Sequence, residues 1–192
     1  MKYNKDVCML LAIDPGINTT GLAVLDIAQK VVVKETVLVK NARKFTPEEK
    51  LIEEAHGTRV VKVLAITNKI EELLDKYKEI DTIVAEAPFY NSLTPMAYGS
   101  LLEVISAIRY MVAYQKSLPF KLIEPLVIKR LFTSKAMASK ELIKHFLHEK
   151  KKDGSIIIDI DIDTLSEHEI DAVAIGFVHR INQLSNQLAQ PT

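Results

Sequence analysis

LLAIDPGINTTGLAVLD, residues Leu10 to Asp26, carries the strongest indication of this chain's fold. It begins inside an apolar run over residues 8–13, which predicts a buried β-strand, and continues through the turn-forming triplet Asp14-Pro15-Gly16. Residues 21–25 predict a second strand, so that the stretch forms a hairpin. A carboxylate is costly inside an apolar core, so Asp14 is expected at the edge of the sheet, where its charge can serve a purpose.

The rest of the chain alternates between helical and strand patterns. A third strand is expected at Val31–Val39, and residues 47–77 have helical periodicity, as one long helix or two, with Gly57 as the weak point. The later elements are a strand at Thr82–Ala85 that ends in Glu86, a helix at Leu93–Gln115, a strand at Phe120–Ile123, short helices at Pro125–Phe132 and Ser139–His148, and a helix at about Ser166–Leu188. Three antiparallel strands followed by two parallel ones predict an α/β fold: a mixed five-stranded sheet with helices on both faces.

Length and composition favour one domain. The chain has 192 residues, of which 48% are hydrophobic and 26% charged, and no Gly/Ser-rich linker divides it. We expect a single domain over residues 1–192, with a core at about 8–185 and a polar tail at 186–192. No apolar run reaches about eighteen residues, and the lone Cys8 can form no internal disulfide. A cytoplasmic protein, neither secreted nor membrane-spanning, is therefore expected.

Charge is distributed unevenly along the chain. The net charge of zero argues against a nucleic-acid partner if taken globally, because phosphate neutralisation drives DNA affinity. However, residues 115–152 carry ten basic and three acidic side chains, whereas residues 153–171 carry seven acidic and no basic ones. A basic surface beside an acidic cluster suits an enzyme that holds phosphates with lysines and hydrolyses one with carboxylate-bound metal. The alternative is two solvated faces of opposite sign.

Three carboxylates lie at positions that predict a shared site. Asp14 closes the first strand, Glu86 closes the fourth, and Asp171 lies one turn into the last helix. Hard divalent ions such as Mg²⁺ prefer carboxylate oxygen, so acids that converge from distant segments can bind them. Two ions about 4 Å apart could activate water and stabilise the leaving oxygen of a phosphodiester. Taken singly, each acid could also be a helix cap or a surface charge.

Three motifs resemble those of the RuvC Holliday-junction resolvases, which have an RNase H-like fold. The opening stretch looks like the family's first hairpin, in which a metal-binding Asp precedes Pro-Gly and a Thr-Gly follows; the matching residues are Asp14, Pro15, Gly16, Thr20 and Gly21. IVAEAPFYN, residues 83–91, is similar to the second motif, a Glu ending a strand with a Phe three residues later. HEIDAVAIGFVH, residues 168–179, looks like the closing motif, in which a metal-binding Asp or His lies three residues before an Asp. The resemblance spans about residues 8–182.

The resemblance implies a catalytic, metal-binding set formed by Asp14, Glu86, His168 and Asp171, with Mg²⁺ as the cofactor and Mn²⁺ as a substitute. The spacing of three places His168 and Asp171 on one face of the last helix. The His168 imidazole could ligate metal or assist proton transfer. Without the motif, His168 would be taken for a surface residue near the start of a helix.

The middle of the chain carries the implied DNA-binding lysines. PFKLIEPLVIK, residues 119–129, resembles the family's strand and the Val-x-Lys that follows it, and a further lysine comes eleven residues later. Family lysines at the positions of Lys129 and Lys140 contact DNA. The expected DNA contacts are these two residues together with the neighbouring basic residues Arg130 and Lys135. The sequence departs from the family pattern at residues 133–138, which lack the usual glycines, and this puts the geometry of that loop in doubt.

Two aromatic residues follow the second motif. Phe89, and more weakly Tyr90, could stack on an unpaired base at a branch point, which is worth on the order of 1 to 3 kcal/mol. Packing under the loop is the alternative for Phe89.

The expected function is that of a homodimeric, Mg²⁺-dependent endodeoxyribonuclease that resolves four-way junctions or other branched DNA, as in a phage-encoded or otherwise divergent RuvC-like protein. The family implies the dimer, and the apolar face of Leu101–Met111 is the expected interface. Two alternatives remain. One is a non-catalytic protein that binds branched DNA; the other is a phosphate-binding ATPase domain of the actin and Hsp70 type, in which Asp-x-Gly-x-x-x-Thr also occurs at a turn.

Two further patterns are interpreted as structural. Asp159–Asp163 looks like the start of a calcium loop, but the sixth position is Thr164 and the twelfth is Ile170, where Gly and Glu are required. An edge strand or an extended connection is the simpler interpretation. His145 and His148 have helical spacing among lysines and are expected at the surface rather than in a metal pair.

Overall fold

The computed structural model describes residues 8–90, 92–93, 95–133 and 140–188. Its centre is one six-stranded sheet with the order β5-β4-β1-β2-β3-β6. The strands are β1 (Met9–Asp14), β2 (Thr19–Asp26), β3 (Val31–Lys40), β4 (Ile80–Glu86), β5 (Phe120–Ile123) and β6 (Ile156–Ile158). The helices are α1 (Pro47–His56), α2 (Thr58–Lys76), α3 (Pro95–Tyr110), the π-helical η1 (Met111–Gln115), α4 (Pro125–Thr133), α5 (Lys140–Lys152), the 3₁₀ turn η2 (Ile162–Thr164) and α6 (Glu167–Leu188).

The mixed sheet confirms the expected fold class, with one correction. β2 pairs antiparallel with both β1 and β3, whereas β4 pairs in parallel with β1, and β5 in parallel with β4. The expected count of five strands was wrong, because β6 adds a sixth strand parallel to β3. β6 has only three residues and pairs only with Val31–Val33, so it is too short for its alternation of buried and exposed residues to identify it in the sequence.

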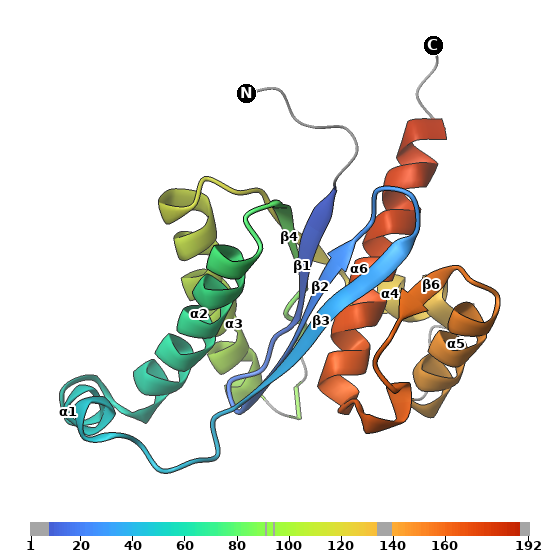
Figure 1. Ribbon diagram of the computed structural model, residues 1–192. Coiled ribbons are helices and arrows are strands. Elements are labelled where there is room, and N and C mark those ends of the chain that lie inside the picture. Colours follow the sequence, from blue (N-terminus) through green and yellow to red (C-terminus); the bar gives the residue numbers. More distant parts are fainter. Residues whose placement is uncertain (1–7, 91, 94, 134–139, 189–192) are drawn as a thin grey trace.

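Helices cover both faces of the sheet (Figure 1). β1 is buried along its whole length, because its alternate side chains point to opposite faces and each face has its own core. Met9, Leu11 and Ile13 pack with α2 and α3, whereas Leu10 and Ala12 pack with α4, α5 and α6. This burial on both faces explains why the strand is a continuous apolar run in the sequence.

The helical region after β3 consists of two helices, which settles the open alternative. Gly57 separates α1 from α2 with a φ of 89°, a conformation that glycine adopts readily and other residues rarely do. The first helix begins with a capping box, in which the Thr46 side chain accepts from the Glu49 backbone N–H and the Glu49 side chain accepts from that of Thr46.

α3 corrects the expected dimer interface. Val104, Ile105 and Ile108 are buried in the core beneath the sheet, so the apolar face of Leu101–Met111 mainly packs within the chain. By length and composition, the segment Pro95–Gln115 could cross a membrane, a test that core helices of soluble proteins also pass. Its buried residues identify one side of α3 as a core face.

Candidate active site

The turn that follows β1 holds Asp14 at the end of its strand. The Thr20 hydroxyl donates to the Gly16 carbonyl at 2.7 Å and accepts from the Gly16 N–H at 3.4 Å, which closes the turn. A Cβ on Gly16 would lie 2.3 Å from the Thr19 carbonyl oxygen, so only glycine fits there. Asp14 is the last residue of β1 and is only 8% exposed. The expected edge position was wrong, because β1 lies inside the sheet between β4 and β2; Asp14 lies at the C-terminal end of this interior strand.

α6 reaches this strand end because two glycines let it lie close to the sheet. Gly21 pairs with Asp14 in the β1–β2 ladder, and a Cβ on Gly21 would lie 1.9 Å from the His168 carbonyl oxygen. Further along α6, a Cβ on Gly176 would come within 2.6 Å of Leu25. The Gly21 contact thus fixes His168 beside the strand neighbour of Asp14.

Asp14 and His168 are hydrogen-bonded across 154 residues of sequence. The His168 Nδ1 lies 2.6 Å from the Asp14 Oδ2, and the imidazole remains 39% exposed while the carboxylate is 11% exposed. An ionised carboxylate only accepts, so Nδ1 carries the proton in this contact, and in the neutral ring Nε2 carries the lone pair. Sequence spacing could not show this pair directly, because it depends on how α6 packs on β2.

Glu86 and Asp171 lie on the elements that flank this pair. β4 pairs in parallel with β1 up to Ile13 and Ala85, so Glu86 is the next residue on the strand beside Asp14. Asp171 lies one turn beyond His168 on α6. As the side chains lie, no three His, Cys, Asp or Glu residues in the described ranges form a metal-ligating group. The donor set of three carboxylates and one imidazole is nevertheless chemically suited to a hard divalent ion.

A pocket that sequence reasoning missed opens beside His168. It has a volume of about 290 Å³ and lies between the β1–β2 turn and the first turns of α3, lined by Pro15, Gly16, Ile17, Asn18, Thr19, Ala97, Ser100, Leu101 and His168. The available signal was the pair of small residues Ala97 and Ser100, one helical turn apart, which leaves room between the helix and the turn.

The structure describes the expected DNA contacts only in part. Phe89 and Tyr90 are 62% and 60% exposed, and Tyr90 makes an edge-to-face contact with Tyr98 at 5.6 Å. The exposure of Phe89 opposes the packing alternative. Arg130 is exposed on α4, whereas Lys135 and the loop expected near it lie outside the described residues, as do the side chains of Lys129 and Lys140.

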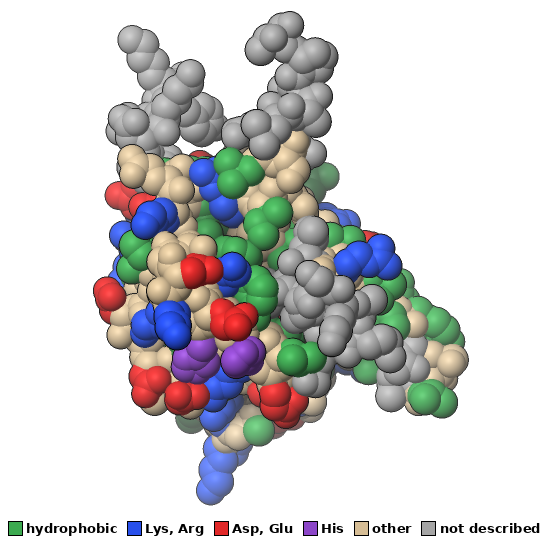
Figure 2. Space-filling model, turned by 90° about the vertical axis from the view of Figure 1, so that its right-hand side faces the viewer, with side chains coloured by type: hydrophobic (Ala, Val, Ile, Leu, Met, Phe, Trp, Pro, Cys, Tyr) green, Lys and Arg blue, Asp and Glu red, His purple; other side chains and the backbone are tan. Residues whose placement is uncertain are grey.

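The basic and acidic segments partly neutralise each other. Lys144 pairs with Asp163 at 2.8 Å and lowers the pKa of that carboxyl, and Lys150 pairs with Asp153 at 2.8 Å. Hydrogen bonds from Lys150 and then Ser155 lower the pKa of Asp153 to about 2. Figure 2 shows acidic and basic side chains interspersed on this side of the molecule. Asp153 and Asp163 therefore act as ion-pair partners of α5.

The calcium-like run and the histidine pair have structural surroundings. The Asp161 side chain accepts from the Asp163 backbone N–H at 3.0 Å and caps η2. The run connects β6 to α6: it follows directly after β6, and its last two residues, Ile162 and Asp163, lie in η2. The simpler interpretation of an edge strand or extended connection is therefore correct only for its first part. His145 and His148 have side chains 70% and 42% exposed, which confirms their surface position.

Comparison with solved structures identifies the fold. No protein-family model and no curated protein matches the chain. Thermus thermophilus RuvC in complex with a Holliday junction substrate superposes with a TM-score of 0.66 and 20% identity, covering 93% of this chain and 96% of that one. A second T. thermophilus RuvC structure superposes with a TM-score of 0.62 and 19% identity, covering 92% of this chain and 96% of that one. The yeast mitochondrial Holliday junction resolvase Ydc2 superposes with a TM-score of 0.61 and 16% identity, covering 92% of this chain and 80% of that one. The chain therefore has the fold of the Holliday junction resolvases RuvC and Ydc2.

Proposed function

We propose that this protein is a divalent-metal-dependent endonuclease that cleaves Holliday junctions or other branched DNA. The observation that carries the proposal is the hydrogen bond between Asp14 and His168, formed at the strand end that Glu86 flanks. Two groups far apart in sequence meet there on a fold shared with two junction resolvases.

The residues of the site have separable tasks. Asp14, Glu86 and Asp171 would hold Mg²⁺ or Mn²⁺ through carboxylate oxygens. A bound divalent ion supplies an activated water and stabilises charge on the leaving oxygen of a phosphodiester. Asp14 orients the His168 ring through Nδ1, so that Nε2 can act as a ligand or accept a proton.

The DNA contacts and the dimer belong to the same proposal. Phe89 and Tyr90 lie just beyond Glu86 and are exposed, which supports stacking on an unpaired base. Lys129, Arg130, Lys135 and Lys140 would bind phosphates near the site. Two copies of the chain would present two sites to the paired strands of a four-way junction.

A panel of labelled four-way junctions, flaps and Y-forks tests the proposal with Mg²⁺ or Mn²⁺. We expect nicking by the wild type, and loss by about 100-fold or more in Asp14→Asn, because several kcal/mol of charge stabilisation depends on that carboxylate. Asp26→Asn is the matched control, since Asp26 closes β2 at the opposite end of the sheet, where it pairs with Met9. If neither ion supports cleavage by the wild type, the nuclease proposal fails, and tight junction binding would then favour a non-catalytic protein.

A further inference from the structure

The outer edge of β3 is only partly occupied. β3 has ten residues, but β6 pairs only with its first three, Val31–Val33. Beyond them, the segment Glu35–Lys40 borders no other described strand on that side. We refer to this six-residue segment as the free edge.

The backbone groups of the free edge alternate in direction. The Asn41 N–H donates to the Asn18 carbonyl at 3.0 Å, so residue 41 faces β2 with its hydrogen-bonding groups. In an antiparallel ladder, every second residue does the same, and the residues between them face outward. Thr36, Leu38 and Lys40 therefore direct their N–H and C=O groups away from β2, and no hydrogen bond within the described ranges uses them.

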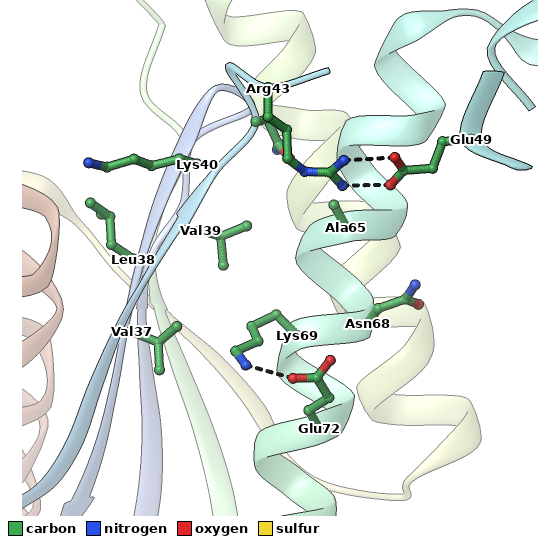
Figure 3. Close-up of a pocket in the computed structure, with 11 residues that line it drawn as sticks. Val37, Leu38, Val39, Lys40, Arg43, Glu49, Ala65, Asn68, Lys69 and Glu72 are labelled. Atoms are coloured by element: carbon green, nitrogen blue, oxygen red, sulfur yellow. Dashed lines mark hydrogen bonds and ion pairs between the residues drawn. The ribbon is translucent and has the colours of Figure 1, made fainter. Parts of the chain in front are cut away.

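A groove runs along the free edge (Figure 3). Its volume is about 330 Å³, and four consecutive strand residues, Val37–Lys40, line it. Alternate side chains point to opposite faces of a sheet, so a groove that touches four in a row lies along the strand's edge. Its opposite wall is one face of α2, formed by Ala65, Asn68, Lys69 and Glu72.

Side-chain directions leave space for one more strand. In Figure 3, Val37 and Val39 point toward α2, and Leu38 and Lys40 point away from it. The bidentate pair of Arg43 with Glu49 closes one end of the groove. A segment added beside β3 would place every second side chain against the α2 wall, where Ala65 is small.

The charges that remain unpaired beside this groove are positive. Glu35 pairs with Lys76 at 2.7 Å, and Lys69 pairs with Glu72 at 2.6 Å. Lys34, just before the free edge, and Lys40, at its last position, are exposed, and neither forms an ion pair with any described residue. A bound segment with acidic residues near its ends would be complementary to them.

We propose that the free edge of β3 binds an extended, acid-flanked peptide segment of a partner protein as an added β-strand. Three outward N–H and three outward C=O groups at strand spacing are the groups with which an added extended backbone pairs, and the α2 wall would contact every second side chain of that segment. The register Leu38–Gly21–Asp14 places the free edge two strands from Asp14, or about 10 Å at the usual spacing. The proposal is independent of the nuclease activity, because no site residue takes part in it.

The probe is an acetylated, fluorescein-labelled peptide, Glu-Val-Thr-Val-Thr-Glu, measured by anisotropy and by amide hydrogen exchange on full-length protein. We expect saturable binding and slowed exchange at Thr36, Leu38 and Lys40. A peptide N-methylated at alternate residues should bind roughly tenfold more weakly, because it lacks half of its donors. Equal binding by the two peptides, protection confined to other residues, or no binding at all would overturn the proposal.

Two variants locate the site. Leu38→Pro removes an outward N–H that β2 does not use, and should weaken binding roughly tenfold, whereas Leu38→Ala keeps the N–H and should stay close to wild type. Lys34→Glu combined with Lys40→Glu should weaken binding of the acid-flanked peptide and strengthen binding of a Lys-flanked one. If Leu38→Pro fails to fold, as thermal melting would show, the N-methylated peptide still decides the test. If the wild type self-associates through this edge and Leu38→Pro alone abolishes that association, the occupant is a second copy and the peptide proposal is wrong.

Discussion

At the scale of single residues, the Asp14 carboxylate and the His168 imidazole define the candidate site. Asp14 is nearly buried, and a buried carboxylate that keeps its charge requires a compensating partner. His168 supplies a donor at 2.6 Å from an element that arrives 154 residues later. The roles of these two side chains can therefore be tested separately, by substituting one residue at a time.

Substitution of His168 separates ligand chemistry from ring-specific chemistry. His168→Ala should reduce metal-dependent cleavage by about 10- to 100-fold, the usual loss when a metal-site residue or its support is removed. His168→Asp places an oxygen ligand at the same helical position and should recover most of the activity. Single-turnover cleavage with Mg²⁺ and Mn²⁺ measures both variants. Equal activity of His168→Ala and wild type would show that the contact is only structural.

A second histidine of α6 is expected to make stability depend on pH. His179 is 5% exposed, and its Nε2 has no hydrogen-bond partner in the part of the chain that the structure describes. Burial, with the charge of Lys121 as the smaller cause, lowers its pKa to about 4 from the ordinary 6.5. The unfolded chain therefore takes up a proton near pH 6.5, whereas the folded chain takes it up only near pH 4.

The difference between these two pKa values sets the direction of the pH dependence. Because the unfolded state binds more protons than the folded state between pH 6.5 and pH 4, the contribution of neutral His179 to the free energy of unfolding is complete above pH 6.5. It is lost as the pH falls toward 4, by about 3 kcal/mol in all. His179→Leu should flatten this part of the pH dependence in urea unfolding experiments. His145→Gln, at an exposed position, should leave it unchanged. Parallel curves for wild type and His179→Leu between pH 6.5 and 4 would contradict the assignment.

At the scale of elements, the close packing of α6 on β2 places two of the four site residues. This contact is possible because Gly21 has no Cβ where the helix backbone passes. The helix carries both His168 and Asp171, so a shift of α6 would move two groups of the site together.

Gly21→Ala should therefore impair both stability and activity. The added methyl group would lie 1.9 Å from the His168 carbonyl oxygen and must displace α6, at a cost of about 1 to 3 kcal/mol or more. Gly99→Ala in α3 is the matched control, since a Cβ there meets nothing within 4 Å; it should be neutral or stabilise by about 0.5 to 1 kcal/mol. Urea unfolding and cleavage by the fraction that stays folded are the measurements. Wild-type cleavage by Gly21→Ala would mean that the position of α6 does not control the site.

At the scale of the whole molecule, each chain offers one candidate site, whereas resolution of a four-way junction requires two cuts. The chain has a mass of 21.6 kDa, and a homodimer would have twice that mass. Two coupled sites predict a specific result when active and inactive chains are mixed.

Mixing wild type with excess Asp14→Asn before adding a cruciform plasmid should convert the product from linear to nicked circles. A mixed dimer keeps one active site and cuts one strand, so the ratio of nicked to linear product should rise with the fraction of inactive chain. Gel electrophoresis of the plasmid measures the ratio, and light scattering measures the mass. A constant ratio together with the mass of a single chain would contradict the dimer.

The elements that were predicted well carry local signals. The strands at Met9–Asp14 and Phe120–Ile123 were foreseen because apolar runs bounded by turn residues identify them. β6 was missed because three residues carry too little pattern, and its partner on β3 is more than 120 residues away in sequence. The apolar side of α3 was assigned to a dimer because an apolar helix face does not reveal whether its own chain or another covers it.

Local patterns were sufficient to predict five of the six strands, the main helices and the mixed sheet, because periodicity and turn chemistry act over a few residues. The four candidate site residues came from the positions of the acids and from the resemblance to the RuvC motifs, without which His168 would be taken for a surface residue. Only the folded structure shows that Asp14 meets His168, that the acids after α5 pair with its lysines, and that six of the ten residues of β3 form a free edge. These contacts depend on packing between segments that are distant in sequence. The close approach of α6 to β2 at Gly21 likewise depends on backbone geometry, which residue types alone do not specify.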